Sequence, residues 1–341
     1  MKQENENIVV YVVGNPRSGT TMLGFILHKH PMVYTFLELH FFDRMWDPRG
    51  RHRPLSRYEA IDLAQRLAGR GRRWGDTKRL FLGSPAYTPD VVDVDSQNDL
   101  CPVDIYKAFL CANTLEHGKT IPCEQTPNYV YYLPEILEAF PKARVVNIVR
   151  DPRDVLLSQK KRWRRYYHRP REITRTDALR LWMNYHPITA SWLWRAAVKQ
   201  ALLFEGHPRV YSVRFEDILE DPERAVEDIC SFIGITYQPE MLNIPMRGSS
   251  LVSDRQDQEG IDKARTGHWQ NRGLNSAERF LCECINGNLM TKFRYPHQKS
   301  LPSLLLLLVC LCALPVKLIM TFLIHGGTFK NLADAVKRRL F

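Results

Sequence analysis

The stretch that decides the fold is Gly14-Asn15-Pro16-Arg17-Ser18-Gly19-Thr20-Thr21. A run of β-branched residues precedes it at positions 8–13, and an apolar run typical of a helix follows at positions 22–27. Strand, glycine-bounded loop and helix are the parts of a phosphate-binding loop, in which backbone N–H groups and a helix N-terminus attract an anion. The spacing fits G-x-x-x-x-G-K-S/T except at one position, where Thr20 replaces the lysine.

The absent lysine narrows the choice of ligand. In ATP and GTP enzymes that lysine contacts the β- and γ-phosphates, and Thr20 does not replace this contact. Arg17 lies inside the loop instead, and its planar guanidinium suits a single, shorter anionic group. The sequence therefore favours a nucleotide that has no γ-phosphate and needs no Mg²⁺. A glycine-rich turn that binds nothing is the alternative.

A second motif follows further along the chain, where a β-branched strand at positions 144–149 ends in Arg150. Pro152 then opens a helical pattern, at a position where its missing N–H costs little, and Ser158 lies on that helix. Open α/β sheets bind ligands at the carboxyl ends of their strands, and a guanidinium there grips a phosphate through two hydrogen bonds. The pair of motifs is far more specific than either alone.

Together the two motifs resemble the nucleotide-binding signatures of sulfotransferases that use 3′-phosphoadenosine 5′-phosphosulfate (PAPS). The resemblance implies that Arg150 and Ser158 hold the 3′-phosphate of PAPS. It also implies that the 5′-phosphosulfate lies against the loop residues Arg17, Ser18, Gly19, Thr20 and Thr21.

Three further stretches extend this resemblance to about residues 8–295, namely 124–137, 213–222 and 265–269. They are similar to segments of bacterial-type and tyrosyl-protein sulfotransferases. The resemblance implies an α/β P-loop three-layer fold with a mostly parallel central sheet, PAPS as the donor substrate, and no metal ion.

The periodicity predicts further elements along the chain. Strands are expected at 120–123, 145–149 and 210–213, and helices at 133–140, 176–205 and 222–233. Residues 39–118 are expected to be irregular, apart from one amphipathic helical patch at 61–67. We interpret 39–118 as an insertion that shapes the acceptor site, because loops at the carboxyl edge of a sheet usually carry specificity.

Sulfuryl transfer needs a general base for the acceptor and positive charge near the leaving phosphate. Arg17 is the candidate for the charge. In tyrosyl-protein sulfotransferases the base is a glutamate shortly after the first helix, and the resemblance assigns this role to Glu38. Apolar neighbours at positions 36, 37, 39, 41 and 42 would raise the pKa of Glu38 by desolvation. His40 is the reserve candidate for the base.

One position departs from the tyrosyl-protein sulfotransferases, which carry a lysine where this chain has Gln125. That lysine is thought to stabilise the bridging oxygen of the leaving group, whereas Gln125 brings a hydrogen-bond donor without charge. Three alternatives remain: Arg17 suffices, Lys78 supplies the charge, or activity is reduced.

The composition limits the kinds of partner and the cellular compartment that we expect for this chain. The net charge of +11 suits an acidic partner, and PAPS itself accounts for part of the excess, so no nucleic acid partner is expected. The eight cysteines match no paired zinc spacing. A polar N-terminus without a secretory signal favours the cytoplasm.

The C-terminal residues form a separate hydrophobic segment. Positions 304–314 and 316–324 are apolar and long enough together to span a bilayer, but Pro315 and Lys317 interrupt them. Basic residues on both sides argue against a single span, so a kinked re-entrant hairpin or an interfacial helix pair is expected on the cytoplasmic face of a membrane. A buried hydrophobic hairpin is the alternative.

The domain prediction is a sulfotransferase domain at 1–299 and a membrane-associated segment with a basic tail at 300–341. The predicted function is transfer of a sulfuryl group from PAPS to a hydroxyl or amine of a glycan, lipid or small molecule. Two other functions stay open. A P-loop kinase-like phosphotransferase is disfavoured by Thr20 and by the absence of an Asp-rich Mg²⁺ motif. The other is a non-catalytic nucleotide-binding protein.

Overall fold

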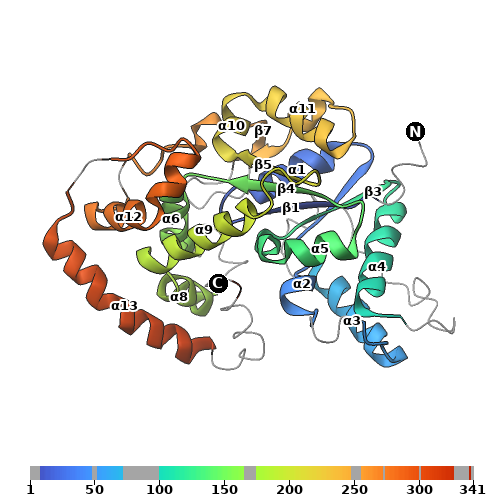
Figure 1. Ribbon diagram of the computed structural model, residues 1–341, viewed down its shortest axis with the longest axis horizontal. Helices are drawn as coiled ribbons and strands as arrows, with labels where there is room; N and C mark the ends of the chain where they lie inside the picture. The colour runs from blue at the N-terminus through green and yellow to red at the C-terminus, as the bar shows by residue number, and fades with distance from the viewer. Residues whose placement is uncertain are drawn as a thin grey trace.

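A five-stranded parallel sheet forms the centre of the computed structural model (Figure 1). The structure describes residues 8–47, 52–71, 100–164, 174–246, 255–271, 273–298, 301–325 and 338. Across the sheet the strands follow the order β2 (Val33–Phe36), β3 (Ile121–Gln125), β1 (Val10–Gly14), β4 (Arg144–Val149) and β5 (Val210–Arg214). The predicted α/β fold with a parallel central sheet is confirmed, and all five of these strands run parallel.

Helices cover both faces of the sheet because successive residues of β1 point to opposite sides. Tyr11 and Val13 belong to the apolar core on one side, whereas Val10 and Val12 belong to the core on the other. The first core is built by α3 (Arg57–Gly71), α4 (Pro102–Glu116), η4 (Pro127–Tyr132), α5 (Leu133–Ala139) and α9 (Pro187–Leu202). The second is built by α1 (Thr20–Lys29), α10 (Phe215–Glu220), α11 (Pro222–Ile233) and η6 (Pro239–Leu242).

Local sequence signals set where the helices begin. Helix α6 (Pro152–Lys160) has proline in its first turn, and the Asp151 side chain accepts a hydrogen bond from Arg153 N. Helices α8 (Arg175–Met183) and α12 (Ser276–Lys292) begin with capping boxes at Thr174 and Asn275. The remaining short elements are α2 (Phe41–Arg44), η5 (Arg162–Arg164), β6 (Pro245–Met246), β7 (Arg255–Glu259) and η7 (Lys263–Arg265).

Residues 39–118 are more regular than the sequence pattern predicted. Their described part contains α2, α3 and α4, and the prediction of a mainly irregular insertion is wrong there. The buried residues of α4 lie on one face, but two of them, Asn113 and Thr114, are polar, and the exposed Leu115 is apolar, so the sequence pattern of this helix is weak. The predicted helix at 176–205 is also wrong, since α8 ends at Met183 and Pro187 opens α9. Strand β2 was not predicted.

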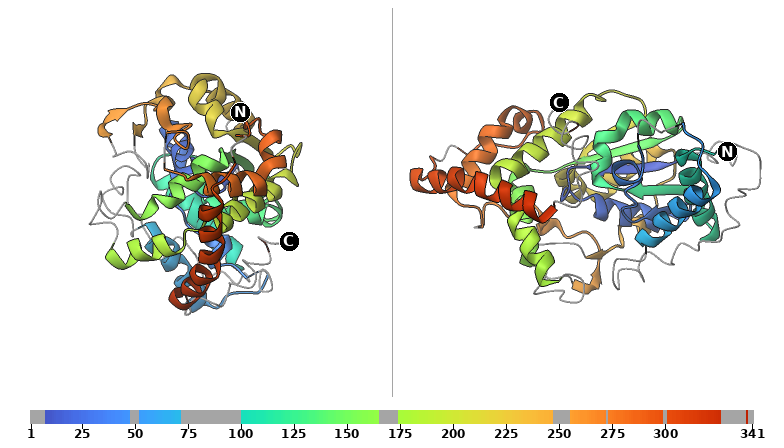
Figure 2. Two further views of the ribbon diagram at one scale, coloured as in Figure 1. Left: turned by 90° about the vertical axis from the view of Figure 1, so that its left-hand side faces the viewer. Right: turned by 90° about the horizontal axis from the view of Figure 1, so that it is seen from below.

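Near the C-terminus, α13 (Leu304–His325) is one continuous helix that contains Pro315. The expected hairpin break at Pro315 is therefore wrong. Over Leu304–Thr321 the mean hydropathy is 2.5, so α13 is long and apolar enough to cross a membrane by length and composition only. Figure 2 shows α13 at the edge of the molecule, where it contacts α8 and α12.

Candidate active site

The loop between β1 and α1 is held against the sheet by two glycines. Gly14 has a φ of 146°, and a Cβ there would lie 2.4 Å from the Ile148 carbonyl oxygen on β4. Gly19 has a φ of 104°, and its Cβ would collide with the Phe215 ring at 2.3 Å. Glycine is required at both positions, because any side chain would push the loop off the sheet.

The first turn of α1 presents its backbone N–H groups to the loop. Gly19 is the N-cap and supplies no side-chain cap, so the N–H groups that open the helix at Thr20 are left for another acceptor. The Ser18 side chain is fully buried, and its Oγ has no hydrogen-bond partner among the described residues. Uncapped N–H groups, the helix dipole and a buried hydroxyl together fit an anion.

Arg17 joins the two sequence motifs. Its Nε donates a hydrogen bond of 3.0 Å to Ser158 Oγ on α6, and Ser158 is itself buried. Arg17 has a φ of 80°, a left-handed conformation that costs free energy for a residue with a side chain. The Arg17 guanidinium thus connects the loop after β1 to helix α6.

Arg150 leaves the end of β4 and lies under the loop. Its Nη1 donates to the Arg17 carbonyl at 3.3 Å and its Nη2 to the Arg265 carbonyl at 2.6 Å. The guanidinium packs 4.4 Å from the centre of the Phe215 ring, and its Nε has no hydrogen-bond partner among the described residues. Burial lowers the pKa of Arg150, although Asp154 opposes the shift. The side chain keeps donor capacity for a phosphate.

Asp154 ties a distant loop to this region. Its carboxylate accepts hydrogen bonds from Gly267 N at 2.8 Å and Trp269 N at 3.0 Å, and it lies 3.9 Å from Arg150 Nη2. Burial raises the pKa of Asp154, while the charge of Arg150 counteracts it. The loop at 265–269 is thus anchored beside Arg150.

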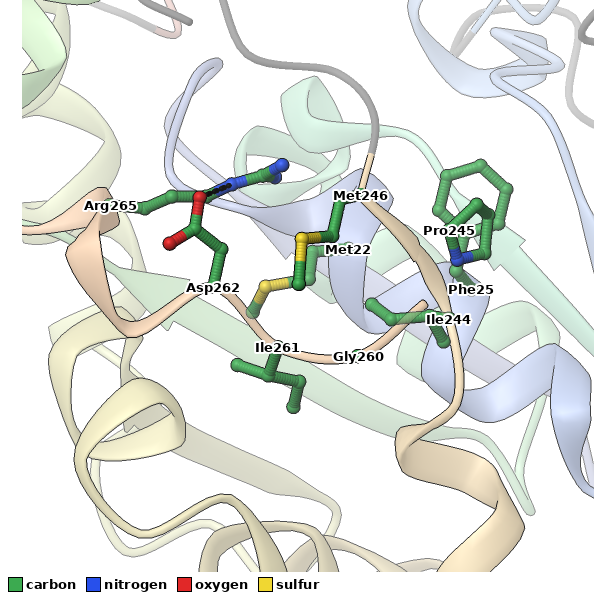
Figure 3. A pocket seen from close by; sticks show the side chains of 9 residues that line it. All are labelled: Met22, Phe25, Ile244, Pro245, Met246, Gly260, Ile261, Asp262 and Arg265. Carbon is green, nitrogen blue, oxygen red and sulfur yellow. Dashed lines mark ion pairs between the residues drawn. The ribbon is translucent and has the colours of Figure 1, made fainter. Parts of the chain in front are cut away.

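An apolar pocket continues the site along α1 (Figure 3). Arg265 forms one wall and pairs with Asp262, whose Oδ2 lies 3.5 Å from Arg265 Nε. The other lining residues are Met22, Phe25, Ile244, Pro245, Met246, Gly260 and Ile261. Sequence reasoning missed this pocket, because its walls come from α1, β6 and η7, which lie far apart in the chain.

The candidate bases lie past the end of β2 and are paired with each other. His40 Nε2 is 3.1 Å from Glu38 Oε2, and His40 Nδ1 is 2.9 Å from Asp43 Oδ2. Burial opposes the charged form, but the hydrogen bonds with Asp43 and Glu38 raise the pKa of His40 to about 9. His40 is therefore an imidazolium at neutral pH, which removes its capacity to accept a proton.

The surroundings of Glu38 differ from the predicted apolar lining. Phe41 and Phe42 are buried in the core, and the Glu38 carboxylate faces His40 instead. Burial lowers the pKa of Arg162 on η5, and the charge of Glu38 nearby counteracts this shift. Glu38 thus lies between two positive groups at the edge of the site.

Glu124, at the carboxyl end of β3, holds this segment in place. Its Oε1 accepts hydrogen bonds from Leu39 N at 2.9 Å and Thr126 Oγ1 at 2.6 Å. Burial raises the pKa of Glu124 to about 8, so the group is mainly protonated at neutral pH. No sequence pattern indicates this protonation, since burial of a carboxyl group depends on the whole core.

The position that departs from the resemblance is buried against α1. Gln125 is 2% exposed, and a Cβ on Gly24 would lie 3.1 Å from its Cγ. Its Oε1 has no hydrogen-bond partner among the described residues. Lys78, the alternative source of charge, lies outside the described residues.

Comparison with known proteins agrees with this geometry. The model of the sulfotransferase family matches residues 10–239. Human sulfotransferase 2A1 is 26% identical over 157 residues, which are 38% of this chain and 50% of that protein. The 3-beta-hydroxysteroid sulfotransferase of Cavia porcellus is 26% identical over 148 residues, 40% of this chain and 49% of that protein. The chain thus spans about half the length of these curated relatives.

Solved structures show the same fold. The sulfotransferase domain of the Synechococcus PCC 7002 olefin synthase superposes with a TM-score of 0.51 at 23% identity, covering 84% of this chain and 95% of that domain. The family match extends from β1 through α11 and includes the phosphate-binding loop, Arg150 and Ser158. The chain belongs to the sulfotransferase family.

Proposed function

We propose that the protein transfers a sulfuryl group from PAPS to a hydroxyl or amine acceptor. The observation that carries this proposal is the hydrogen bond from Arg17 Nε to Ser158 Oγ, because it unites the 5′-phosphosulfate loop with the 3′-phosphate motif in one site. PAPS supplies the sulfuryl group, and adenosine 3′,5′-bisphosphate is the leaving group.

The residues present fit such a donor. The uncapped start of α1, with the hydroxyls of Ser18, Thr20 and Thr21, suits the 5′-phosphosulfate. Arg150 and Ser158 suit the 3′-phosphate, since Arg150 Nε is buried without a partner among the described residues.

Glu38 is the proposed base and Arg17 the proposed stabiliser of the leaving phosphate. The acceptor oxygen or nitrogen forms its bond to sulfur as the bond to the bridging oxygen breaks, and Glu38 takes the acceptor proton. Arg17 faces the negative charge that develops on the leaving group. His40 Nε2 lies 3.1 Å from Glu38 Oε2 and orients that carboxylate.

The acceptor class follows less directly from the site. One relative is named for hydroxysteroids, so a hydroxyl on an apolar small molecule or lipid is a candidate, with a glycan as the third class of acceptor. We place residues 1–299 in the sulfotransferase domain and 300–341 at the cytoplasmic face of a membrane. Support for this location comes from the outward apolar side chains of α13 and from the net charge of +11.

Two measurements test the function. Calorimetry should show that adenosine 3′,5′-bisphosphate binds in the presence of a metal chelator. ATP with Mg²⁺ should bind much more weakly. Labelled PAPS should then pass its sulfate to lipid, glycan or small-molecule fractions. A preference for ATP with Mg²⁺ would establish the kinase-like alternative. Tight binding without turnover on any fraction would establish a non-catalytic binding protein.

A further inference from the structure

Helix α13 has one face that packs on the protein and one that does not. Its half-buried residues recur three or four positions apart, the spacing of one helical stripe. They are Leu307, Cys310, Ala313, Leu314, Lys317 and Thr321. All the other described side chains from Leu304 to Met320 are exposed. The helix is therefore attached sideways along its length, and its remaining apolar surface faces outward.

Three polar contacts fix that attachment. Ser303 N donates to Ser276 Oγ at 3.1 Å, and His186 Nε2 donates to the Cys310 carbonyl at 3.0 Å. Lys317 forms the third contact, to α8 and the residues after it. Positions 303, 310 and 317 are seven residues apart, nearly two helical turns, so all three contacts lie along the same stripe.

Of the three contacts, the one at Lys317 has the most partners. Its ammonium donates to the Trp182 carbonyl at 3.1 Å and the Tyr185 carbonyl at 2.7 Å. It also lies 4.5 Å from the centre of the Trp182 ring. The carbonyls at a helix C-terminus attract a cation, and an aromatic face adds to the attraction. A charge that would be costly inside a bilayer is thus satisfied by the folded domain.

The outward surface of α13 extends onto α8. Leu305, Val309 and Ile319 are each more than half exposed. On α8, Leu179 and Trp182 are 56% and 50% exposed and lie three residues apart, on one face. Soluble monomers rarely expose an apolar patch of this extent.

We propose that this surface, formed by the outward face of α13 with Leu179 and Trp182, binds one leaflet of a lipid bilayer. Helix α13 then lies parallel to the membrane plane and does not cross it. Crossing would require Lys317 to leave its partners, or α8 with its charged residues Arg175, Asp177 and Arg180 to enter the hydrocarbon. The inference rests on the membrane location proposed above and is independent of the sulfuryl-transfer chemistry.

A bilayer fits this surface better than a second copy of the chain does. The exposed part of α13 carries aliphatic side chains without a charge over several turns, and a tryptophan lies at its margin, as at membrane interfaces. A net charge of +11 attracts the chain to anionic lipids but makes two copies repel each other.

Vesicle flotation of the full-length protein tests the surface. The double variant Leu305→Asp with Ile319→Asp should lose at least tenfold in partition to phosphatidylcholine–phosphatidylserine vesicles and still bind adenosine bisphosphate normally. The matched control is Leu115→Asp, an equally exposed leucine on α4, on the other side of the molecule from α13 (Figure 1). Equal partition of the double variant and wild type, or an equal loss in Leu115→Asp, would overturn the proposal. So would a wild-type dimer that the double variant dissociates.

Orientation is tested separately. In inverted membrane vesicles, added protease should digest tags at both ends of the chain. Protection of either tag alone would show that α13 crosses the membrane and would overturn the proposal that it lies in the membrane plane. Brominated lipids should quench a part of the tryptophan fluorescence that is missing in Trp182→Phe. Equal quenching in wild type and Trp182→Phe would remove α8 from the surface. If these membrane results held but the protein showed no sulfuryl transfer, only the proposed function would be contradicted.

Discussion

The two halves of the sheet edge are built in different ways. At β1 and β4, the nucleotide half, Arg17 and Arg150 extend from elements that local sequence defines, and Gly14 and Gly19 have no steric alternative. At β2 and β3, the acceptor half, Glu38 depends on charged partners and on a loop held by Glu124. The proposed nucleotide half therefore depends on backbone geometry, whereas the proposed acceptor half depends on paired charges.

The acceptor half should show the largest effect. Glu38→Gln should lower kcat by about 10²–10⁴ because it removes the proposed base, while leaving the affinity for adenosine bisphosphate unchanged. Single-turnover transfer from labelled PAPS measures the first quantity and calorimetry the second. The matched control is Glu59→Gln, a carboxylate paired with Arg53 on the surface of α3.

The result that would contradict this prediction concerns His40. If Glu38→Gln kept near-normal turnover while His40→Ala lost most of it, the base would be His40. The raised pKa of His40, about 9, argues against this, because an imidazolium has no lone pair to accept a proton.

Arg17→Ala tests the role of Arg17 in the proposed nucleotide half. We expect a loss of about 10²–10³ in kcat together with weaker donor binding, since a preorganised positive group at the leaving phosphate is removed. Arg66→Ala, which breaks an exposed ion pair with Asp62, is the control and should leave kcat and donor KM unchanged. Unchanged turnover in Arg17→Ala would remove this residue from the site.

Arg150→Ala and Ser158→Ala should act mainly on donor affinity. The 3′-phosphate is remote from the reacting sulfur, so these contacts stabilise ground and transition states alike. We expect the donor KM to rise by about 10- to 100-fold with a smaller change in kcat, the size of one charge-assisted hydrogen bond. Adenosine 5′-phosphosulfate lacks the 3′-phosphate, and equal use of it by the wild-type enzyme would contradict this assignment.

The last prediction concerns stability and again separates the halves. The pKa of Glu124 is raised from 4.5 to about 8, so the folded state binds a proton that the unfolded state releases between these values. Stability should therefore fall with pH in that window, by up to about 1.4 kcal/mol per pH unit. Glu124→Gln keeps an acceptor for Leu39 N and should flatten this slope in denaturant titrations.

His40 must be separated from Glu124 in that experiment. Its raised pKa contributes stability that is complete below about 6.5 and is lost as the pH rises through about 9. His40→Gln should remove the loss at the alkaline end only. A slope that persists from pH 5 to 8 in Glu124→Gln would show that Glu124 is not the buried proton site.

The nucleotide half was predictable from the chain because its geometry is local. A β-branched strand, two glycines and a helix start specify the loop, and Pro152 with Ser158 specify the second motif in the same way. Their meeting was inferred from the rule that carboxyl ends of parallel strands form one edge, and the 3.0 Å bond from Arg17 to Ser158 agrees with it. Glu38 was given the wrong neighbours, because its carboxylate faces His40 and not an apolar lining.

By itself, then, the sequence determined the α/β class, the parallel sheet and the glycine-bounded loop between β1 and α1, since periodicity and glycine positions act over a few residues. Only the tertiary structure decided the charge of His40, the protonation of Glu124 and the hydrogen-bond partners of Lys317. Glu124 and Lys317 depend on partners distant in the chain, Leu39 N and the Tyr185 carbonyl. The partners of His40, Glu38 and Asp43, are close in the chain, but the folded segment brings all three together and buries His40. Desolvation and pairing set these charges, and neither exists until the chain has folded.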